Sequence, residues 1–142
     1  MIIAGLVGHP VTLSFEQLAT LPQIEDVGRL VPGRKGAAVR LHDVLAGARP
    51  DTAATHATLA SSDGDFTASV PLDEIGNALL VYRLGDQPLP ESLGGPVRFL
   101  IPDAKACHSG GADTCANVKF LGSITLTAGG RPDTRDEKTP HA

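Results

Sequence analysis

Two basic side chains of this sequence stand inside apolar runs, where a charge needs a partner. Arg98 lies within VRFLI, and Lys119 lies within NVKFL. A guanidinium with apolar neighbours on both sides is at least partly buried, and burial without a partner is costly. Its partner is either a carboxylate such as Asp73 or Glu91, or a phosphate, whose oxygens match the planar guanidinium fork. The pattern alone favours an ion pair for Arg98, and for Lys119 an ammonium that reaches the surface.

Both cysteines fall in one short segment, CHSGGADTC, between the two basic runs. Three interpretations are open. The cysteines form a disulfide if the protein is exported, or they are ordinary thiols in the cytosol. The third is a metal site made by Cys107, His108 and Cys115, with Asp113 as a further ligand. Zinc sites use closer cysteine spacing than this, so the pattern favours a disulfide or free thiols over a metal.

A second pair of cations, Arg34 and Lys35, stands between Gly33 and Gly36. This segment lacks the strand and helix that flank a phosphate-binding loop, so the sequence predicts a solvated basic turn. The histidines outside the cysteine segment have no Ser or Cys partner at a spacing typical of nucleophilic catalysis.

The elements that position these residues are short. A capping box at Ser14 and Gln17 predicts a brief helix, which Pro22 ends, and apolar spacing predicts a second helix from Leu41 to Ala48. Asp63-Gly64 between two β-prone runs predicts a hairpin. The segment from Gln23 to Lys35 has no period and is predicted to be a loop. Further predicted strands cover residues 2–7, 11–13, 79–83, 97–101, 118–121 and 124–127.

This mixture of short strands and helices, without regular β-α-β spacing, predicts an α+β domain. We expect that domain to cover residues 1–128. From residue 129 the chain is rich in Gly, Pro and charge, so residues 129–142 are predicted to form a polar, flexible tail that is ordered only where it docks.

Composition restricts the classes of partner. The chain has 142 residues, a net charge of -4, 4% aromatic residues and no Trp. Nucleic-acid binding needs a basic surface or aromatic stacking platforms, so this balance argues against it. No apolar run reaches the roughly 18 residues that span a bilayer, which argues against a membrane. The opening residues read as a strand and not as a signal peptide, so the sequence as written predicts a cytoplasmic protein, and a mature exported form would be periplasmic.

The stretch from Leu79 to Pro102, LLVYRLGDQPLPESLGGPVRFLIP, resembles the molybdopterin-binding domain of the sulfite oxidase family. Its most specific pieces are QPLP, GPVR and IP, followed later by VKFL. Other pieces of the family pattern are GLV near the start, the helix LHDVL, and a Ser-x-Asp-Gly hairpin followed by SVPL. These pieces occur in family order from Gly5 to about Leu126. The resemblance implies a compact α+β fold with mixed sheets and short helices.

The resemblance also implies site residues and a cofactor. Arg98 and Lys119 occupy the motif positions whose side chains help to hold the pterin phosphate, and backbone groups of Gly94 and Gly95 form the turn beside them. The implied cofactor is molybdopterin, the organic part of the molybdenum cofactor. The implied partners are a pterin or another anionic small molecule, together with an electron-transfer or assembly protein.

Two departures from the family pattern bear on activity. Sulfite oxidases have a His five residues before the strand Arg, and this chain has Leu93 there. They also supply a thiolate to the molybdenum from the loop before the LHDVL helix, and here the segment from Gln23 to Lys35 holds no cysteine. The carboxylates in that segment, Glu25 and Asp26, are hard oxygen ligands and do not replace a soft thiolate.

Three functional hypotheses follow. The first is a molybdopterin-binding domain of an oxidoreductase with altered catalysis. The second is a non-catalytic relative that has lost the cofactor and serves as a binding or assembly module. The third is a thiol or metal module built on the Cys107–Cys115 segment.

Overall fold

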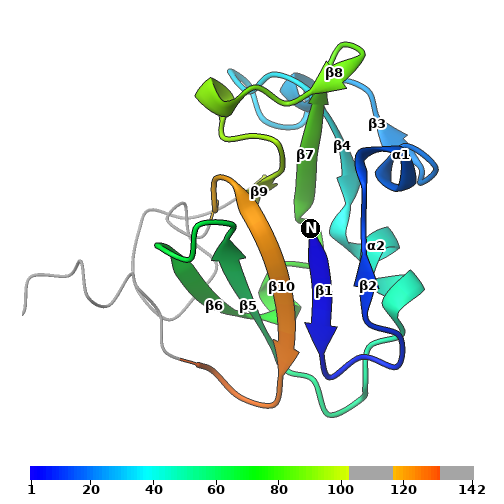
Figure 1. The fold of residues 1–142 in the computed structure, drawn as a ribbon, viewed down its shortest axis with the longest axis vertical. Helices are drawn as coiled ribbons and strands as arrows, with labels where there is room; N and C mark the ends of the chain where they lie inside the picture. The colour runs from blue at the N-terminus through cyan, green and yellow to red at the C-terminus, as the bar shows by residue number, and fades with distance from the viewer. Residues whose placement is uncertain (103–116, 132–142) are drawn as a thin grey trace, which may run out of the picture.

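Two five-stranded sheets make up most of the molecule (Figure 1). The structure is a computed structural model that describes residues 1–102 and 117–131. The first sheet has the strand order β2-β1-β10-β5-β6. Its strands are β1 at Ile2–Gly5, β2 at Val11–Thr12, β5 at His56–Ser61, β6 at Thr67–Pro71 and β10 at Leu121–Thr127. It is a mixed sheet, because β1 and β10 run parallel and its other neighbours antiparallel.

The second sheet, antiparallel throughout, is centred on one strand, β7, in the upper part of Figure 1. The order is β3-β4-β7-β8, and β9 also pairs with β7. These strands are β3 at Gln23–Ile24, β4 at Ala37–Arg40, β7 at Leu79–Leu84, β8 at Gln87–Pro88 and β9 at Arg98–Leu100. Because β7 pairs with three strands, it fixes the positions of the loops that leave β4, β8 and β9.

The helices are short and lie in the connections. The α-helices are α1 at Phe15–Leu18 and α2 at Leu41–Ala48, and the 3-10 turns are η1 at Val27–Arg29, η2 at Leu72–Glu74 and η3 at Glu91–Leu93. The predicted capping box is present, since Ser14 and Gln17 bond each other's backbone amides. In the described part of the chain, no helix is both long and apolar enough to cross a membrane.

The two faces of β7 serve two different cores. Leu80 and Tyr82 pack into the larger core, which extends between the two sheets. Leu79 and Val81 point to the opposite face and join a smaller core that includes Leu100. Successive side chains of a strand point to opposite faces, so a strand buried on both faces is apolar at every position. This explains the unbroken apolar run at the start of β7.

The predicted α+β class, with mixed sheets and short helices, is confirmed. One strand prediction is wrong: residues 118–120 are not a strand, and the last strand begins at Leu121. Phe120 has a positive φ of 54°, which breaks any extended run there. The predicted loop from Gln23 to Lys35 contains the short strand β3 and the turn η1.

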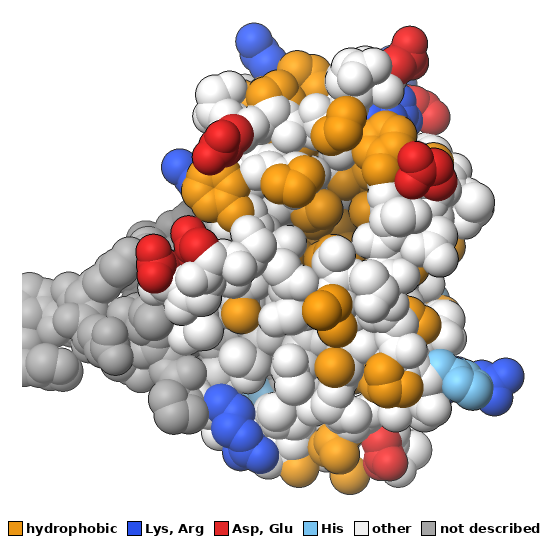
Figure 2. Space-filling view, viewed as in Figure 1, with side chains coloured by type: hydrophobic (Ala, Val, Ile, Leu, Met, Phe, Trp, Pro, Cys, Tyr) orange, Lys and Arg blue, Asp and Glu red, His pale blue; other side chains and the backbone are white. Residues whose placement is uncertain are grey.

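Charge is dispersed over the face of the molecule seen in Figure 2. Apolar side chains gather in the upper half of this view, and the Lys and Arg side chains stand apart at its margins.

Candidate functional site

Strand β9 directs Arg98 toward the smaller core. Phe99 packs into the core between the sheets, so Arg98 and Leu100, one residue to either side, lie on the opposite face. Arg98 pairs with Val81 of β7 in the sheet register, which anchors its backbone. The sequence run VRFLI therefore places the Arg98 side chain over the apolar side chains of the smaller core.

The turn before β9 brings Arg98 close to Lys119. Gly94 has a φ of +94°, and a Cβ built on it would lie 3.0 Å from Arg98 Cδ and 3.0 Å from Lys119 Cγ. The carbonyl of Gly94 also accepts a hydrogen bond from the Phe120 amide at 2.7 Å. The aliphatic parts of both basic side chains therefore pack against one glycine, and a larger residue there would have to displace them.

Gly95 makes an even closer backbone contact. Its amide donates to the Pro90 carbonyl at 3.0 Å, and the Gly95–Pro96 peptide bond is cis. A Cβ on Gly95 would fall 1.7 Å from the Leu89 carbonyl oxygen. Backbone atoms cannot move aside at that distance, so only glycine fits at this position.

A cavity of about 150 Å³ lies beside Arg98. Its remaining lining comes from the smaller core and from the turn before β4: Gly33, Arg34, Lys35, Val81, Leu89, Leu93 and Leu100. Among the described residues, three cationic side chains and no acidic side chain line this space. The sequence predicted a solvated basic turn at Arg34 and Lys35. Lys35 is exposed and Arg34 is half-buried, and both residues line the cavity.

Arg98 makes fewer hydrogen bonds to the described residues than a partly buried guanidinium requires. Its Nε is fully buried and has no hydrogen-bond partner among residues 1–102 and 117–131, where its Nη1 donates a long bond of 3.4 Å to the Leu93 carbonyl. Burial, and after it the nearby positive charge of Arg34, lowers the pKa of Arg98. Within residues 1–102 and 117–131, the carboxylates considered as partners, Asp73 and Glu91, form no ion pair with Arg98.

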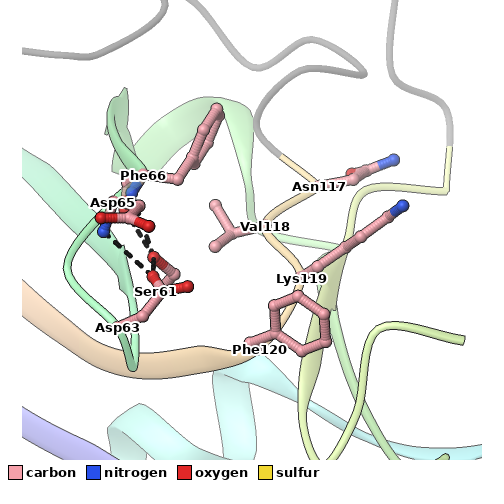
Figure 3. Close-up of a pocket in the computed structure, with 8 residues that line it drawn as sticks. All are labelled: Ser61, Asp63, Asp65, Phe66, Asn117, Val118, Lys119 and Phe120. Atoms are coloured by element: carbon pink, nitrogen blue, oxygen red, sulfur yellow. Dashed lines mark hydrogen bonds between the residues drawn. The ribbon is translucent and has the colours of Figure 1, made fainter. Parts of the chain in front are cut away.

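The side chain of Lys119 extends from an adjoining hollow of about 330 Å³, whose lining Figure 3 draws. In that view the Lys119 ammonium points away from Ser61, Asp63 and Asp65, which form a hydrogen-bonded group on the other side. Ser61 Oγ donates to Asp63 Oδ1 at 2.6 Å, and this bond contributes most to lowering the Asp63 pKa. Lys119 is exposed, as predicted from its pattern, and its stem packs against Gly94.

The candidate metal or thiol residues, Cys107, His108 and Cys115, lie outside the described residues, as does Asp113. Among the residues that are described, no three His, Cys, Asp or Glu side chains come together as metal ligands do.

The site therefore has the cavity beside Arg98, and the exposed side chain of Lys119 lies next to Arg98 at Gly94. The sequence predicted Arg98, Lys119, Gly94 and Gly95 as neighbours, and the fold brings these four together. It missed Arg34. Two glycines that flank a pair of cations were the available signal, and only the fold reveals that the turn faces Arg98.

Comparisons with known proteins agree on one family. Residues 35–133 match the sequence profile of the family described as oxidoreductase molybdopterin binding domain. The mitochondrial sulfite oxidases of Rattus norvegicus and Mus musculus are each 35% identical over an alignment of 101 positions, and the match covers 63% of this chain. The chain spans only 17% of the length of these relatives.

A solved structure has a similar fold. The sulfane dehydrogenase SoxCD from Paracoccus pantotrophus superposes with a TM-score of 0.73 at 18% identity. The match covers 94% of this chain and 39% of the other. At that identity the likeness concerns the fold alone.

Proposed function

Because this chain belongs to the oxidoreductase molybdopterin binding domain family, we propose that it binds molybdopterin through the phosphate of that cofactor. The phosphate lies in the cavity beside Arg98, with Lys119 at the edge and the Gly94–Gly95 turn between them. The observation that carries this proposal is the buried Nε of Arg98, which has no partner among the described residues. A buried guanidinium nitrogen without an acceptor is costly, and a phosphate oxygen supplies that acceptor.

The dimensions of the cavity support the anionic end of the cofactor as the buried part. Pockets that enclose a whole organic ligand usually measure about 300–1,000 Å³. The cavity beside Arg98 measures about 150 Å³, so it accommodates a phosphate group and leaves the ring system outside. Lys119, which is exposed beside Gly94, would be available to the part of the cofactor outside the cavity.

The donor set fits the phosphate better than it fits the metal. When bound, the cofactor supplies a molybdenum centre that exchanges oxygen atoms and electrons with a substrate. The segment from Gln23 to Lys35 offers that centre no thiolate, because it contains no cysteine. Glu25, moreover, already pairs with Arg83 at 2.9 Å. We therefore propose a domain that retains cofactor binding and has lost or altered the oxidation of sulfite.

Production of the chain in a host that makes the molybdenum cofactor tests this proposal. The expected result is pterin bound to the purified protein, measured by fluorescence after oxidation, and its loss in Arg98→Gln. Molybdenum is counted in the same samples by mass spectrometry. Purified protein without pterin, from a host in which a sulfite oxidase is loaded, would contradict the proposal.

A non-catalytic binding module remains the second candidate, favoured by the missing thiolate and by Leu93 in the cavity wall. Bound pterin distinguishes the two candidates, and sulfite-dependent reduction of an artificial electron acceptor then shows whether a pterin-loaded chain is active. Pterin bound without electron transfer fits the altered domain. The binding module predicts neither pterin nor electron transfer.

A further inference from the structure

We infer that the Gly33–Gly36 turn is an anion-binding element, and that Arg34 and Lys35 close a site for one tetrahedral oxyanion opposite Arg98. The ligand chemistry is a phosphate or sulfate group, either free or at the end of an organic molecule. This inference deepens the proposed function, since both use Arg98, and it adds the second half of the site.

The turn is held firmly in place. Gly36 has a φ of +110°, and a Cβ there would lie 2.8 Å from the Arg83 carbonyl of β7. Its carbonyl accepts a hydrogen bond from the Val27 amide at 3.0 Å, and the Arg34 amide donates to the Val31 carbonyl at 3.1 Å. These contacts hold the turn against η1 and the central strand β7. The backbone of Arg34 therefore loses little conformational freedom when an anion binds in the cavity.

Nearby carboxylates are engaged elsewhere. Asp26 lies 3.9 Å from Arg29, and Glu25 lies 2.9 Å from Arg83. In the described part of the chain, Arg34 forms no such ion pair, although it is half-buried and belongs to the same segment. Arg29 and Arg83, which have acidic partners, are not among the residues that line the cavity, whereas Arg34 is.

The electrostatic cost of placing these cations around one cavity indicates a ligand. Arg34 and Arg98 line the same cavity, and burial, followed by the charge of Arg34, lowers the pKa of Arg98. The rest of the cavity wall is apolar, and a low-dielectric surface strengthens repulsion between like charges. In a chain with a net charge of -4, such a group of cations is not a consequence of overall composition. A doubly charged oxyanion relieves the repulsion and gives Arg98 Nε its missing acceptor.

Titration with inorganic phosphate, followed by the arginine Nε–H signals in ¹H–¹⁵N spectra at constant ionic strength, tests the inference. The signal that disappears in Arg98→Lys identifies Arg98. We expect that signal to shift saturably, because its Nε–H gains an acceptor. Arg34→Gln should weaken phosphate binding about tenfold, the value of one charge-assisted contact. Phenyl phosphate as a second probe separates a free oxyanion from a phosphate ester, because the tighter of the two identifies the source.

Arg29→Gln is the matched control, since Arg29 is an exposed cation of the same segment that pairs with Asp26. It should leave phosphate affinity unchanged apart from ionic-strength effects, and Lys35→Gln should weaken binding less than Arg34→Gln. If Arg34→Gln unfolds, Arg34→Lys keeps the charge and should bind phosphate at an intermediate affinity. Equal weakening by Arg29→Gln and Arg34→Gln, or no saturable shift of the Arg98 signal, overturns the inference.

The outcomes separate this inference from the proposed function. Phosphate binding that depends on Arg34, in a chain that takes up no pterin, keeps the inference and removes the function. Unchanged phosphate affinity in Arg34→Gln, in a chain that takes up pterin, keeps the function and removes the inference.

Discussion

Arg98 destabilises the ligand-free fold and is suited to bind an anion. Its side chain lies against apolar residues of the cavity wall, and its Nε lacks a partner among the described residues. The positive charge of Arg34 also repels it. Functional sites often carry such a cost, since a group held ready for a ligand is unsatisfied without one. This balance of stability against binding can be measured.

Replacing Arg98 with Met should separate the two properties. Met preserves the volume of the side chain and removes the unpaired charge, so the ligand-free protein should become more stable, by up to about 1 kcal/mol for a partly solvated site. Phosphate and pterin binding should be lost. Urea unfolding with and without phosphate measures both effects. A clear loss of stability in the ligand-free variant would mean that Arg98 has a structural partner.

Gly94 offers a second test on the scale of one residue. Gly94→Ala should cost about 1 kcal/mol, since φ is positive there, and it should also displace Arg98 and Lys119. Gly85→Ala is the control, because Gly85 has a φ of +61° and open space around it. We expect similar losses of stability and weaker phosphate binding only in Gly94→Ala. Equal phosphate binding by both variants would mean that Gly94 does not organise the site.

The sequence was sufficient to predict Arg98 and insufficient to predict Arg34. A charge inside an apolar run is visible without a fold, because burial follows from its neighbours. The importance of Arg34 depends on a contact between segments more than 60 positions apart, and no local pattern encodes that contact. The pattern around Arg98 favoured a carboxylate partner, and no such pair occurs within residues 1–102 and 117–131.

On the scale of elements, strong local chemistry predicted structure well. The Ser14 capping box, the helix at Leu41–Ala48 and the hairpin at Asp63-Gly64 are all present. The failure at residues 118–120 has a tertiary cause: the Phe120 amide donates to Gly94, and Leu121 donates to Val97. These bonds hold the segment in a non-extended form that its β-prone residues do not favour by themselves.

The β5–β6 hairpin should lose stability in acid through Asp63. Hydrogen bonds from Ser61 and the Asp65 amide lower the folded-state pKa of Asp63 from its ordinary value of 3.8. A lowered folded pKa gives stability that is present above the unfolded pKa and is lost as the pH falls through the folded value. Asp63→Asn should therefore flatten the decline of unfolding free energy below about pH 4.

Urea unfolding at a series of pH values checks this prediction. Asp65→Asn is the control, since Asp65 contributes its backbone amide to the network and the substitution retains that group. An identical acid decline in the wild type and in Asp63→Asn would show that the Asp63 carboxylate does not hold the turn.

At the scale of the whole molecule, the end of the first sheet raises the question of the domain boundary. Gly129 donates to Thr55 Oγ1 at 2.8 Å, and the Arg131 amide donates to Ser69 Oγ at 3.0 Å. The boundary proposed from composition, at residue 128, therefore cuts through two hydrogen bonds. We place the functional boundary after Arg131 as a proposal.

Two shortened chains test this boundary. A chain that ends at Arg131 should unfold at the same temperature as the full chain, because both hydrogen bonds remain. A chain that ends at residue 128 should lose about 1 kcal/mol, the net value of one or two exposed hydrogen bonds. Thermal unfolding followed by circular dichroism compares the three. A lower midpoint for the chain that ends at Arg131 would show that residues 132–142 stabilise the domain.

Nuclear magnetic resonance of ³¹P in the pterin-loaded chain tests most directly whether a phosphate group lies against Arg98. A free phosphate ester loses its second proton near pH 6. Contact with the guanidinium groups favours the dianion, so the bound phosphate should titrate below that value, and the phosphate released when the protein is denatured should titrate near pH 6. A bound phosphate that titrates near pH 6 in the wild type, or a chain that retains no phosphorus, would contradict the claim.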